Sequence, residues 1–140
     1  MFRHIGIVVS DIDTQLKFYK DLLNLEVYYD KVEKGEFSSH IIDKSNLKAH
    51  VIKLGKNSET IVELLKFEKK PRLAFPGKSL FQKRITHFAL TVQNLDELFL
   101  KMSKKNINFV NYPKISENKK YKVCFCQDYE GNFVELVEEL

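Results

Sequence analysis

The chain carries one pattern twice, first as Arg3-His4-Ile5-Gly6-Ile7-Val8-Val9-Ser10-Asp11-Ile12-Asp13 and again as Thr86-His87-Phe88-Ala89-Leu90-Thr91-Val92-Gln93-Asn94-Leu95-Asp96. In each copy a histidine precedes an apolar, strand-like run, which ends in a polar pair suited to the N-cap of a helix. Self-similarity of this kind is typical of a duplicated structural module. We therefore expect two copies of one supersecondary unit.

An amphipathic helix is predicted after each copy, because apolar residues recur there at helical spacing. The residues that share one helical face are Ile12, Leu16, Tyr19 and Leu23 in the first half and Leu95, Leu98, Phe99 and Met102 in the second. Asn24 and Asn106 then mark the helix ends, since asparagine tolerates the left-handed conformation of a C-cap. Strand-like residues follow at 25–29 and 107–110.

Two further strands are predicted in each half. They span residues 49–54 and 60–67 around a turn at 55–58, and residues 121–127 and 132–137 around a turn at 128–132. The predicted fold class is therefore α+β, with two tandem βαβββ modules in one domain of residues 1–140. Module 1 covers about 1–67, a linker about 68–84, and module 2 about 85–140. Residues 30–48 form either an irregular strand or a mobile lid.

The bulk composition excludes several classes of protein. The formal net charge is +4 and the charged residues make up 30% of the chain, an ordinary mix for a soluble globular domain. No apolar run is long enough for a transmembrane helix, and no signal peptide is recognisable, so a cytoplasmic protein without a membrane partner is expected. The basic cluster between Lys66 and Arg84 lacks an aromatic platform, which argues against nucleic acid. Cys124 and Cys126 are expected to be reduced thiols in or beside the core.

Four polar residues occupy places where strands are usually apolar. His4 and His87 lead the first strand of each module, on the strand face that also carries the small residues Gly6 and Ala89. Glu63 and Glu135 interrupt the apolar last strands, where a lone carboxylate is costly to desolvate unless it is paired or bound to an ion. Because the repeat places all four in register, we expect one divalent metal ion held by His4, Glu63, His87 and Glu135. Imidazole and carboxylate ligands suit zinc, nickel, cobalt, manganese or iron(II).

His40 and His50 have no counterpart in the other half and are expected on the surface or in loops.

At these residues the sequence resembles the vicinal oxygen chelate superfamily, which includes glyoxalase I, methylmalonyl-CoA epimerase, extradiol dioxygenases and the fosfomycin- and bleomycin-resistance proteins. The resemblance covers almost the whole chain. Its clearest parts are the two histidine-led strands and the stretch Asp128-Tyr129-Glu130-Gly131-Asn132-Phe133-Val134-Glu135-Leu136. That stretch is similar to the family's Asp-Pro-Asp-Gly-Asn turn before a metal-binding glutamate, with Tyr129 and Glu130 as departures. The resemblance implies a curved mixed sheet around a central metal site.

The ligand set of two histidines and two glutamates is closest to that of glyoxalase I. The first strand, however, lacks the arginine that contacts glutathione in that enzyme, so the resemblance does not carry glutathione dependence over to this chain. A methylmalonyl-CoA-epimerase-like enzyme is a second reading. It would use the basic Lys66–Arg84 rim for nucleotide phosphates, although such epimerases usually carry glutamine where Glu63 stands. A third hypothesis is a non-catalytic protein that binds a drug or metabolite. Such a protein needs no metal, so the presence of all four ligand residues argues against it.

The expected reaction is a metal-dependent isomerisation or lysis of a small substrate with vicinal oxygens, and the candidate substrates include a thioester and a thiol adduct. A bound ion polarises a carbonyl, lowers the pKa of the adjacent C–H and stabilises an enediolate. By resemblance Glu135 is the base and Glu63 its counterpart on the other side of the substrate, with His4 and His87 as ligands only. A homodimer is expected, as in similar proteins, and the two modules pair either within one chain or across two.

Overall fold

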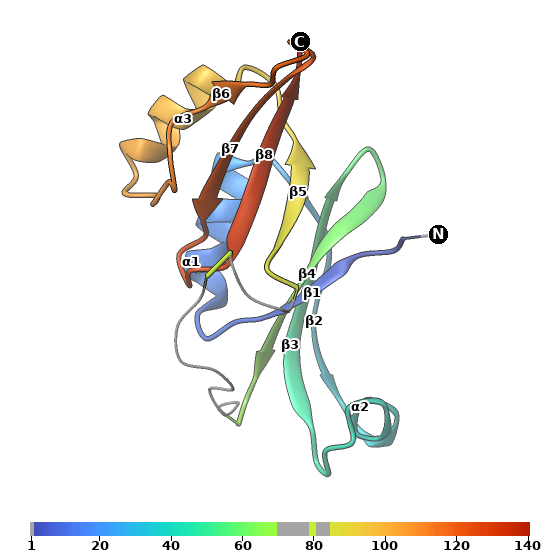
Figure 1. Ribbon diagram of the computed structural model, residues 1–140. Coiled ribbons are helices and arrows are strands. Elements are labelled where there is room, and N and C mark those ends of the chain that lie inside the picture. The colour runs from blue at the N-terminus through green and yellow to red at the C-terminus, as the bar shows by residue number, and fades with distance from the viewer. Residues whose placement is uncertain (1, 70–78, 81–84) are drawn as a thin grey trace. The chain divides into compact units, whose positions relative to one another are not determined.

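The computed structural model describes residues 2–69, 79–80 and 85–140. The chain divides into two compact units, Met1–Ala74 and Phe75–Leu140 (Figure 1). Each unit contains one mixed four-stranded sheet. The predicted basic linker falls largely outside the described residues, as do Lys70, Arg72, Lys78, Lys83 and Arg84.

The first unit has a sheet of strand order β1-β4-β3-β2, in which β1 runs parallel to β4 and the other pairs are antiparallel. Its α1 continues directly into the π-helical segment η1. The elements are β1 (Ile5–Val8), α1 (Ile12–Leu16), η1 (Lys17–Leu22), β2 (Glu26–Lys34), α2 (Glu36–Ile42), β3 (Lys48–Lys56) and β4 (Glu59–Phe67).

The second unit repeats this topology with the order β5-β8-β7-β6, and β5 again runs parallel to the last strand. Its elements are β5 (His87–Thr91), α3 (Leu95–Ser103), β6 (Lys114–Ile115), β7 (Tyr121–Gln127) and β8 (Phe133–Glu139). The predicted duplication of a βαβββ arrangement in an α+β fold is therefore confirmed.

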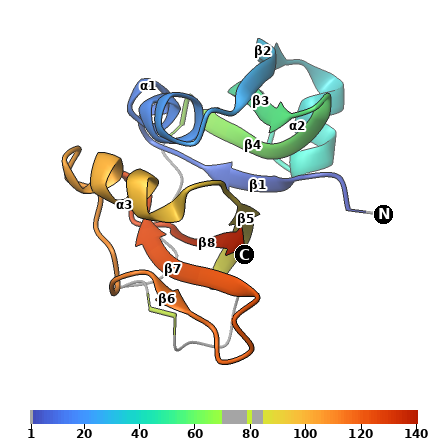
Figure 2. The ribbon, with the colours of Figure 1, turned by 90° about the horizontal axis from the view of Figure 1, so that it is seen from above.

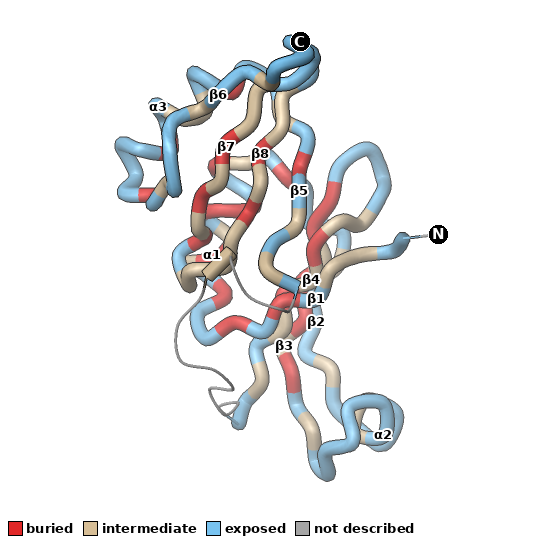
Figure 3. The backbone as a smooth tube through the Cα atoms, viewed as in Figure 1, coloured by how far each residue is buried: buried red, intermediate tan, exposed pale blue. Residues whose placement is uncertain are grey.

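Alternating burial along the strands separates a helix-covered face from a second face in each sheet (Figure 3). On β4, Val62 and Leu64 are fully buried, and on β8 Val134 and Leu136 are. The first helix contacts β4 and α3 contacts β8 (Figure 2). Glu63 and Glu135 lie between these buried residues in sequence, so their side chains project from the opposite face.

The first helix starts as predicted and then departs from regular geometry. Asp11 is its N-cap, with a side chain that accepts hydrogen bonds from the Thr14 amide at 3.2 Å and the Thr14 hydroxyl at 2.7 Å. The π-helical segment changes the spacing of side chains, so that Phe18 and Leu22 are buried with Tyr19, while Leu16 and Leu23 are only half-buried. Gln15 is also fully buried, and neither of its amide atoms has a hydrogen-bond partner among the described residues.

The helix α3 of the second unit is capped by a residue that is distant in sequence. Asn94 adopts a left-handed conformation at the N-cap of α3, and its side chain makes no cap hydrogen bond. Instead the Glu138 carboxylate accepts from the backbone amides of Asn94 at 3.0 Å and Leu95 at 3.3 Å. The expectation that the side chains after both first strands would serve as caps is correct for Asp11 and wrong for Asn94.

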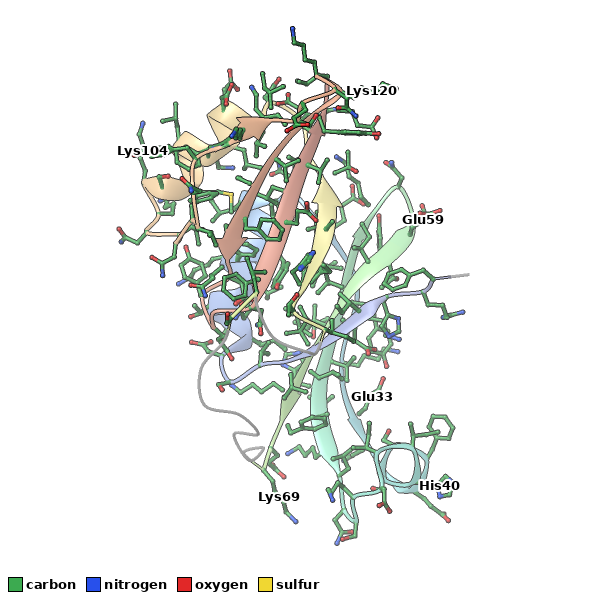
Figure 4. All side chains as sticks on the ribbon, in the orientation of Figure 1. Glu33, His40, Glu59, Lys69, Lys104 and Lys120 are labelled. Carbon is green, nitrogen blue, oxygen red and sulfur yellow. The ribbon has the colours of Figure 1, made fainter. Side chains whose placement is uncertain are left out.

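Residues 30–48 begin as a strand, which was one of the two alternatives expected for them, and then form a helix that was not predicted. Strand β2 continues to Lys34, and α2 follows it with no buried residue. Phe37 is 79% exposed and Ile41 63% exposed, so the apolar pair that α2 carries at helical spacing is exposed and not packed against the sheet. Figure 4, in which His40 is labelled, shows side chains of α2 projecting away from the strands.

The strand predicted at residues 107–110 is largely absent. Only Phe109 forms an isolated bridge, to Cys126, and the second strand of this unit is the short β6 instead. Other local predictions are confirmed: Asn24 and Asn106 have positive φ after their helices, and Asn57 and Ser58 form the left-handed pair that a tight hairpin turn needs. No helix in the described ranges is long and apolar enough to cross a membrane.

Candidate metal centre

The first unit brings His4 and Glu63 together. Glu63 pairs with Gly6 across the parallel β1–β4 ladder, and His4 lies two residues before Gly6, which makes it the diagonal neighbour of the carboxylate. The His4 Nε2 is 3.2 Å from the Glu63 Oε2, and the two side chains are 27% and 15% exposed. Gly6 leaves the space beside Glu63 free of a side chain.

The second unit forms the same pair from equivalent positions. Glu135 on β8 pairs with Ala89 on β5, and the His87 Nε2 is 3.5 Å from the Glu135 Oε2. The other ring nitrogen of His87, Nδ1, is 3.0 Å from the Thr86 hydroxyl oxygen. A hydrogen bond there fixes the ring and leaves Nε2 directed at the carboxylate.

The spacing within both pairs fits two ligands of one ion. Two donor atoms that each lie about 2.1 Å from an ion and about 90° apart are about 3 Å from each other. Imidazole nitrogen beside carboxylate oxygen is also the donor chemistry that first-row divalent ions accept. Each unit therefore supplies a histidine–glutamate half-site.

The four predicted ligands are brought together as two pairs. No group of three or more His, Cys, Asp or Glu side chains suited to a metal ion is formed among the residues that are described. The convergence of His4, Glu63, His87 and Glu135 on one ion stays a prediction.

Lys53 is a charged neighbour of the first half-site that sequence reasoning missed. It lies on β3 directly opposite Glu63, and its Nζ is 3.3 Å from the Glu63 Oε1. The equivalent residue in the second unit, opposite Glu135 on β7, is Phe125. Its ring makes an edge contact with His87, with ring centroids 5.0 Å apart. The two half-sites thus have the same donors and different surroundings.

Tyr29 extends the polar contacts of the first half-site along the sheet. It pairs with Lys53 in the β2–β3 ladder, and the Lys53 Nζ lies 5.3 Å from the centre of its ring. The Tyr29 hydroxyl donates to the Glu33 Oε1 at 2.8 Å, and this hydrogen bond raises the pKa of Tyr29. Glu33 is labelled beside β2 in Figure 4.

Two other groups of predicted residues lie outside the half-sites. His50, on β3, is only partly exposed and is 2.6 Å from the Asp30 carboxylate through Nε2, whereas His40 is on the exposed face of α2. Cys124 and Cys126 are free and buried, as predicted. Burial raises the pKa of Cys124 to about 11, and burial together with the charges of Cys124 and Asp128 raises the pKa of Cys126 further.

The turn before Glu135 is held by one buried carboxylate. Asp128 is 4% exposed and accepts from the amides of Glu130 at 3.0 Å and Asn132 at 2.8 Å, and from the Asn132 side chain at 2.8 Å. Gly131 has φ 78°, which favours glycine. This turn delivers the chain into β8 and so fixes the register of Glu135.

Solved structures of similar proteins share this fold at low sequence identity. A glyoxalase family protein from Bacillus cereus superposes with a TM-score of 0.89 at 20% identity, covering 99% of this chain and 93% of that one. The trypanothione-dependent glyoxalase I of Leishmania major gives a TM-score of 0.59 at 21% identity, covering 97% and 84%. A fosfomycin resistance protein from Listeria monocytogenes gives 0.60 at 15%, covering 100% and 93%.

The sequence itself is similar to a lactoylglutathione lyase of Schizosaccharomyces pombe, with 28% identity over 144 aligned residues. The match covers 98% of this chain and 47% of the relative, so the chain spans about half the length of that protein. A family profile described as the glyoxalase/bleomycin resistance protein/dioxygenase superfamily matches residues 3–125. Because this match covers most of the chain, including both histidine-led strands and the whole first sheet, the chain belongs to the glyoxalase/bleomycin resistance protein/dioxygenase superfamily.

Proposed function

We propose that the chain is a metal-dependent isomerase or lyase of glyoxalase type, with His4, Glu63, His87 and Glu135 as ligands of one divalent ion. The observation that carries the proposal is the pair of histidine–glutamate half-sites, with Nε2–Oε2 distances of 3.2 and 3.5 Å at equivalent register positions of the two units. Family membership and the similarity to a lactoylglutathione lyase support it.

The four side chains have separate tasks in this proposal. The ion, when bound, polarises a substrate carbonyl and makes the neighbouring C–H more acidic. His4 and His87 act as neutral ligands through Nε2. Glu135 removes the proton and returns it to the adjacent carbon, and Glu63 is its counterpart at the other half-site. A two-residue offset within each sheet keeps both histidines on the same face as the carboxylates.

The proposed substrate is a small α-hydroxycarbonyl, thiohemiacetal or acyl thioester that chelates the ion through two adjacent oxygens. The name of the yeast relative favours a thiol adduct among these. The ion is zinc, nickel, cobalt, manganese or iron, and the proposed assembly is a homodimer.

Metal analysis combined with an assay panel tests the proposal. Purified protein is expected to bind one ion per chain, because the four ligands serve a single site. Metal-loaded protein is then assayed with hemithioacetals and with methylmalonyl-CoA. Absence of any bound ion after exposure to all five metals would contradict the proposal and favour a binding protein without catalysis.

Replacing Glu135 with glutamine tests the assignment of the base. Glu135→Gln is expected to lower kcat by about 10²–10⁴-fold, since an amide cannot accept the proton. Glu139→Gln is the matched control, because Glu139 lies on the same strand four residues after Glu135, which places it on the same face, and is exposed. Retention of full activity by Glu135→Gln would assign the proton transfer to another group.

A further inference from the structure

We infer that Lys53 is a positioning residue that holds Glu63 by its Oε1 and thereby makes the two ligand carboxylates inequivalent, with Glu63 anchored and Glu135 free to carry the proton. The inference rests on the proposed function and adds a residue to it. Neither the sequence pattern nor the duplicated topology assigns a role to Lys53. The role of Lys53 is inferred from the difference between the two half-sites, which otherwise match.

The strand register places Lys53 and Phe125 at the same point of the duplicated fold. In the first sheet Glu63 lies between Gly6 and Lys53. In the second sheet Glu135 lies between Ala89 and Phe125. The small residue is kept on one side of each glutamate, while the other side carries an ammonium group in one unit and a phenyl ring in the other.

The Glu63 carboxylate uses its two oxygens differently as a result. Oε1 is 3.3 Å from the Lys53 Nζ, and Oε2 is 3.2 Å from the His4 Nε2. A carboxylate held in this way has Oε2 available to an ion, and its rotation would break the ion pair with Lys53. Within the described residues the one ion-pair contact of Glu135 is with His87, so its carboxylate has no comparable anchor.

Lys53 is itself held in place. Its ammonium lies 5.3 Å from the centre of the Tyr29 ring, within reach of a cation–π interaction, and its side chain is 31% exposed. Lys31 also contacts this ring, at 5.5 Å, and it has no ion pair with Glu63. Tyr29 is fixed by its hydrogen bond to Glu33. The ammonium is thus poised between an aromatic face and the carboxylate.

A positive charge at this position also opposes a bound cation. An ammonium on Oε1 is separated by a single carboxylate group from an ion on Oε2, and like charges at such a distance repel measurably even in a solvated site. Removing the ammonium therefore relieves this repulsion and also frees Glu63 to rotate, and these two changes have opposite effects on the affinity for the ion. If Lys53 positions Glu63, the loss of the anchored ligand dominates and the affinity falls. If Lys53 acts by its charge alone, the affinity rises.

Calorimetric zinc titration of the metal-free protein tests the inference directly. Lys53→Met is expected to bind zinc about tenfold more weakly than the unsubstituted protein, because Glu63 is then no longer held with its Oε2 toward the ion. Lys53→Arg keeps a cation opposite Glu63 and is expected to retain most of the affinity. Lys31→Met is the matched control: it removes the same charge from the same aromatic face, and its affinity is expected to be unchanged. Circular dichroism confirms that each variant is folded, and Lys53→Gln replaces Lys53→Met should the latter fail to fold.

The outcomes separate the two proposals. Zinc affinity that is unchanged or strengthened in folded Lys53→Met or Lys53→Gln would overturn the role of Lys53 and leave the metal site standing. An equal loss in Lys31→Met would also overturn it, because the effect would then not depend on the contact with Glu63. Failure of the unsubstituted protein to bind zinc or any of the other four ions would instead reject the proposed function.

Discussion

The two glutamates illustrate how a strand tolerates a half-buried charge. Glu63 and Glu135 have side chains 15% and 25% exposed, in strands whose neighbouring residues are fully buried. Leaving such a carboxylate without a partner costs free energy, so each has a histidine beside it. Glu63 has a second partner in Lys53, which lowers that cost before any ion binds.

The buried thiols allow a prediction about chemical reactivity. The pKa of Cys124 is about 11 because burial disfavours the thiolate, and that of Cys126 is raised further. Since the thiolate is the reactive form, we expect iodoacetamide at pH 8 to alkylate both cysteines at least about a hundredfold more slowly in the folded protein than in urea. Mass spectrometry of the time course measures this. Comparable rates in both states would show that the strand β7 opens readily.

The raised thiol pKa values also fix the sign of a pH effect on stability. Between about pH 9, where an unfolded thiol ionises, and the folded pKa of about 11 for Cys124, the unfolded chain binds fewer protons than the folded one. The contribution of this thiol to stability is therefore present below pH 9 and is lost as the pH rises through that window.

At the level of residues, the sequence predicted the donors better than their surroundings. His4, Glu63, His87 and Glu135 could be found because the duplication shows each of them twice. Lys53 could not, because its contact with Glu63 depends on the exact pairing of β3 with β4, and one lysine among 23 basic residues carries no signal of its own. The burial of Gln15 was also missed, because the π-helical segment that follows it changes which side chains of the helix face the core.

At the level of elements, the hairpin between β3 and β4 depends on one glycine. A Cβ atom added to Gly55 would collide with the carbonyl oxygen of Glu59, a backbone atom that cannot move without disturbing the turn. Asn57 and Ser58 hold this turn in its left-handed conformation. Because Glu63 follows on β4, the turn also sets the register of the first half-site.

We therefore expect Gly55→Ala to lower the free energy of unfolding by about 2 kcal/mol or more. Gly6→Ala is the matched control, since its Cβ would meet only ordinary contacts at 3.6 and 3.9 Å and the second unit already has Ala89 at that position. Urea unfolding followed by circular dichroism measures both. Equal stability of Gly55→Ala and the unsubstituted protein would mean that the hairpin can relax around the added methyl group.

The elements that were predicted correctly have local signals, and those that were missed do not. Asp11 caps its helix from within the same segment, whereas α3 is capped by Glu138 on β8, which only the folded sheet brings near. The helix α2 is only seven residues long and has one apolar pair at helical spacing, Phe37 and Ile41, which is too short a pattern to indicate a helix. The second strand of the second unit was predicted at residues 107–110 but is β6, because its position depends on pairing with β7 and not on local propensity.

At the level of the whole molecule, a shared ion would make the two units depend on each other. Adding zinc to the metal-free protein at about a hundred times its dissociation constant would stabilise the folded state by about 2.7 kcal/mol. We expect amide exchange, measured by mass spectrometry, to slow in both β4 and β8. In His87→Ala, which removes a ligand from the second unit, we expect zinc to lose its effect on β4 as well.

The reciprocal variant, His4→Ala, should remove the effect of zinc on β8. If instead each histidine–glutamate pair bound an ion of its own, His87→Ala would leave the protection of β4 intact and the stoichiometry would approach two ions per chain. That result would reject the single shared site while keeping both half-sites.

The pairing of β1 with β4 and of β5 with β8 has a consequence for how such proteins diversify. The opening strand of each half is hydrogen-bonded to its closing strand, and in the part of the chain that the structure describes neither sheet contains a strand from the other half. Genetic exchange at the junction would hand over an intact half together with its histidine and glutamate. The surroundings of one histidine–glutamate pair can therefore change while the other pair stays the same. Independent change of this kind would account for a lysine, Lys53, opposite Glu63 and a phenylalanine, Phe125, opposite Glu135.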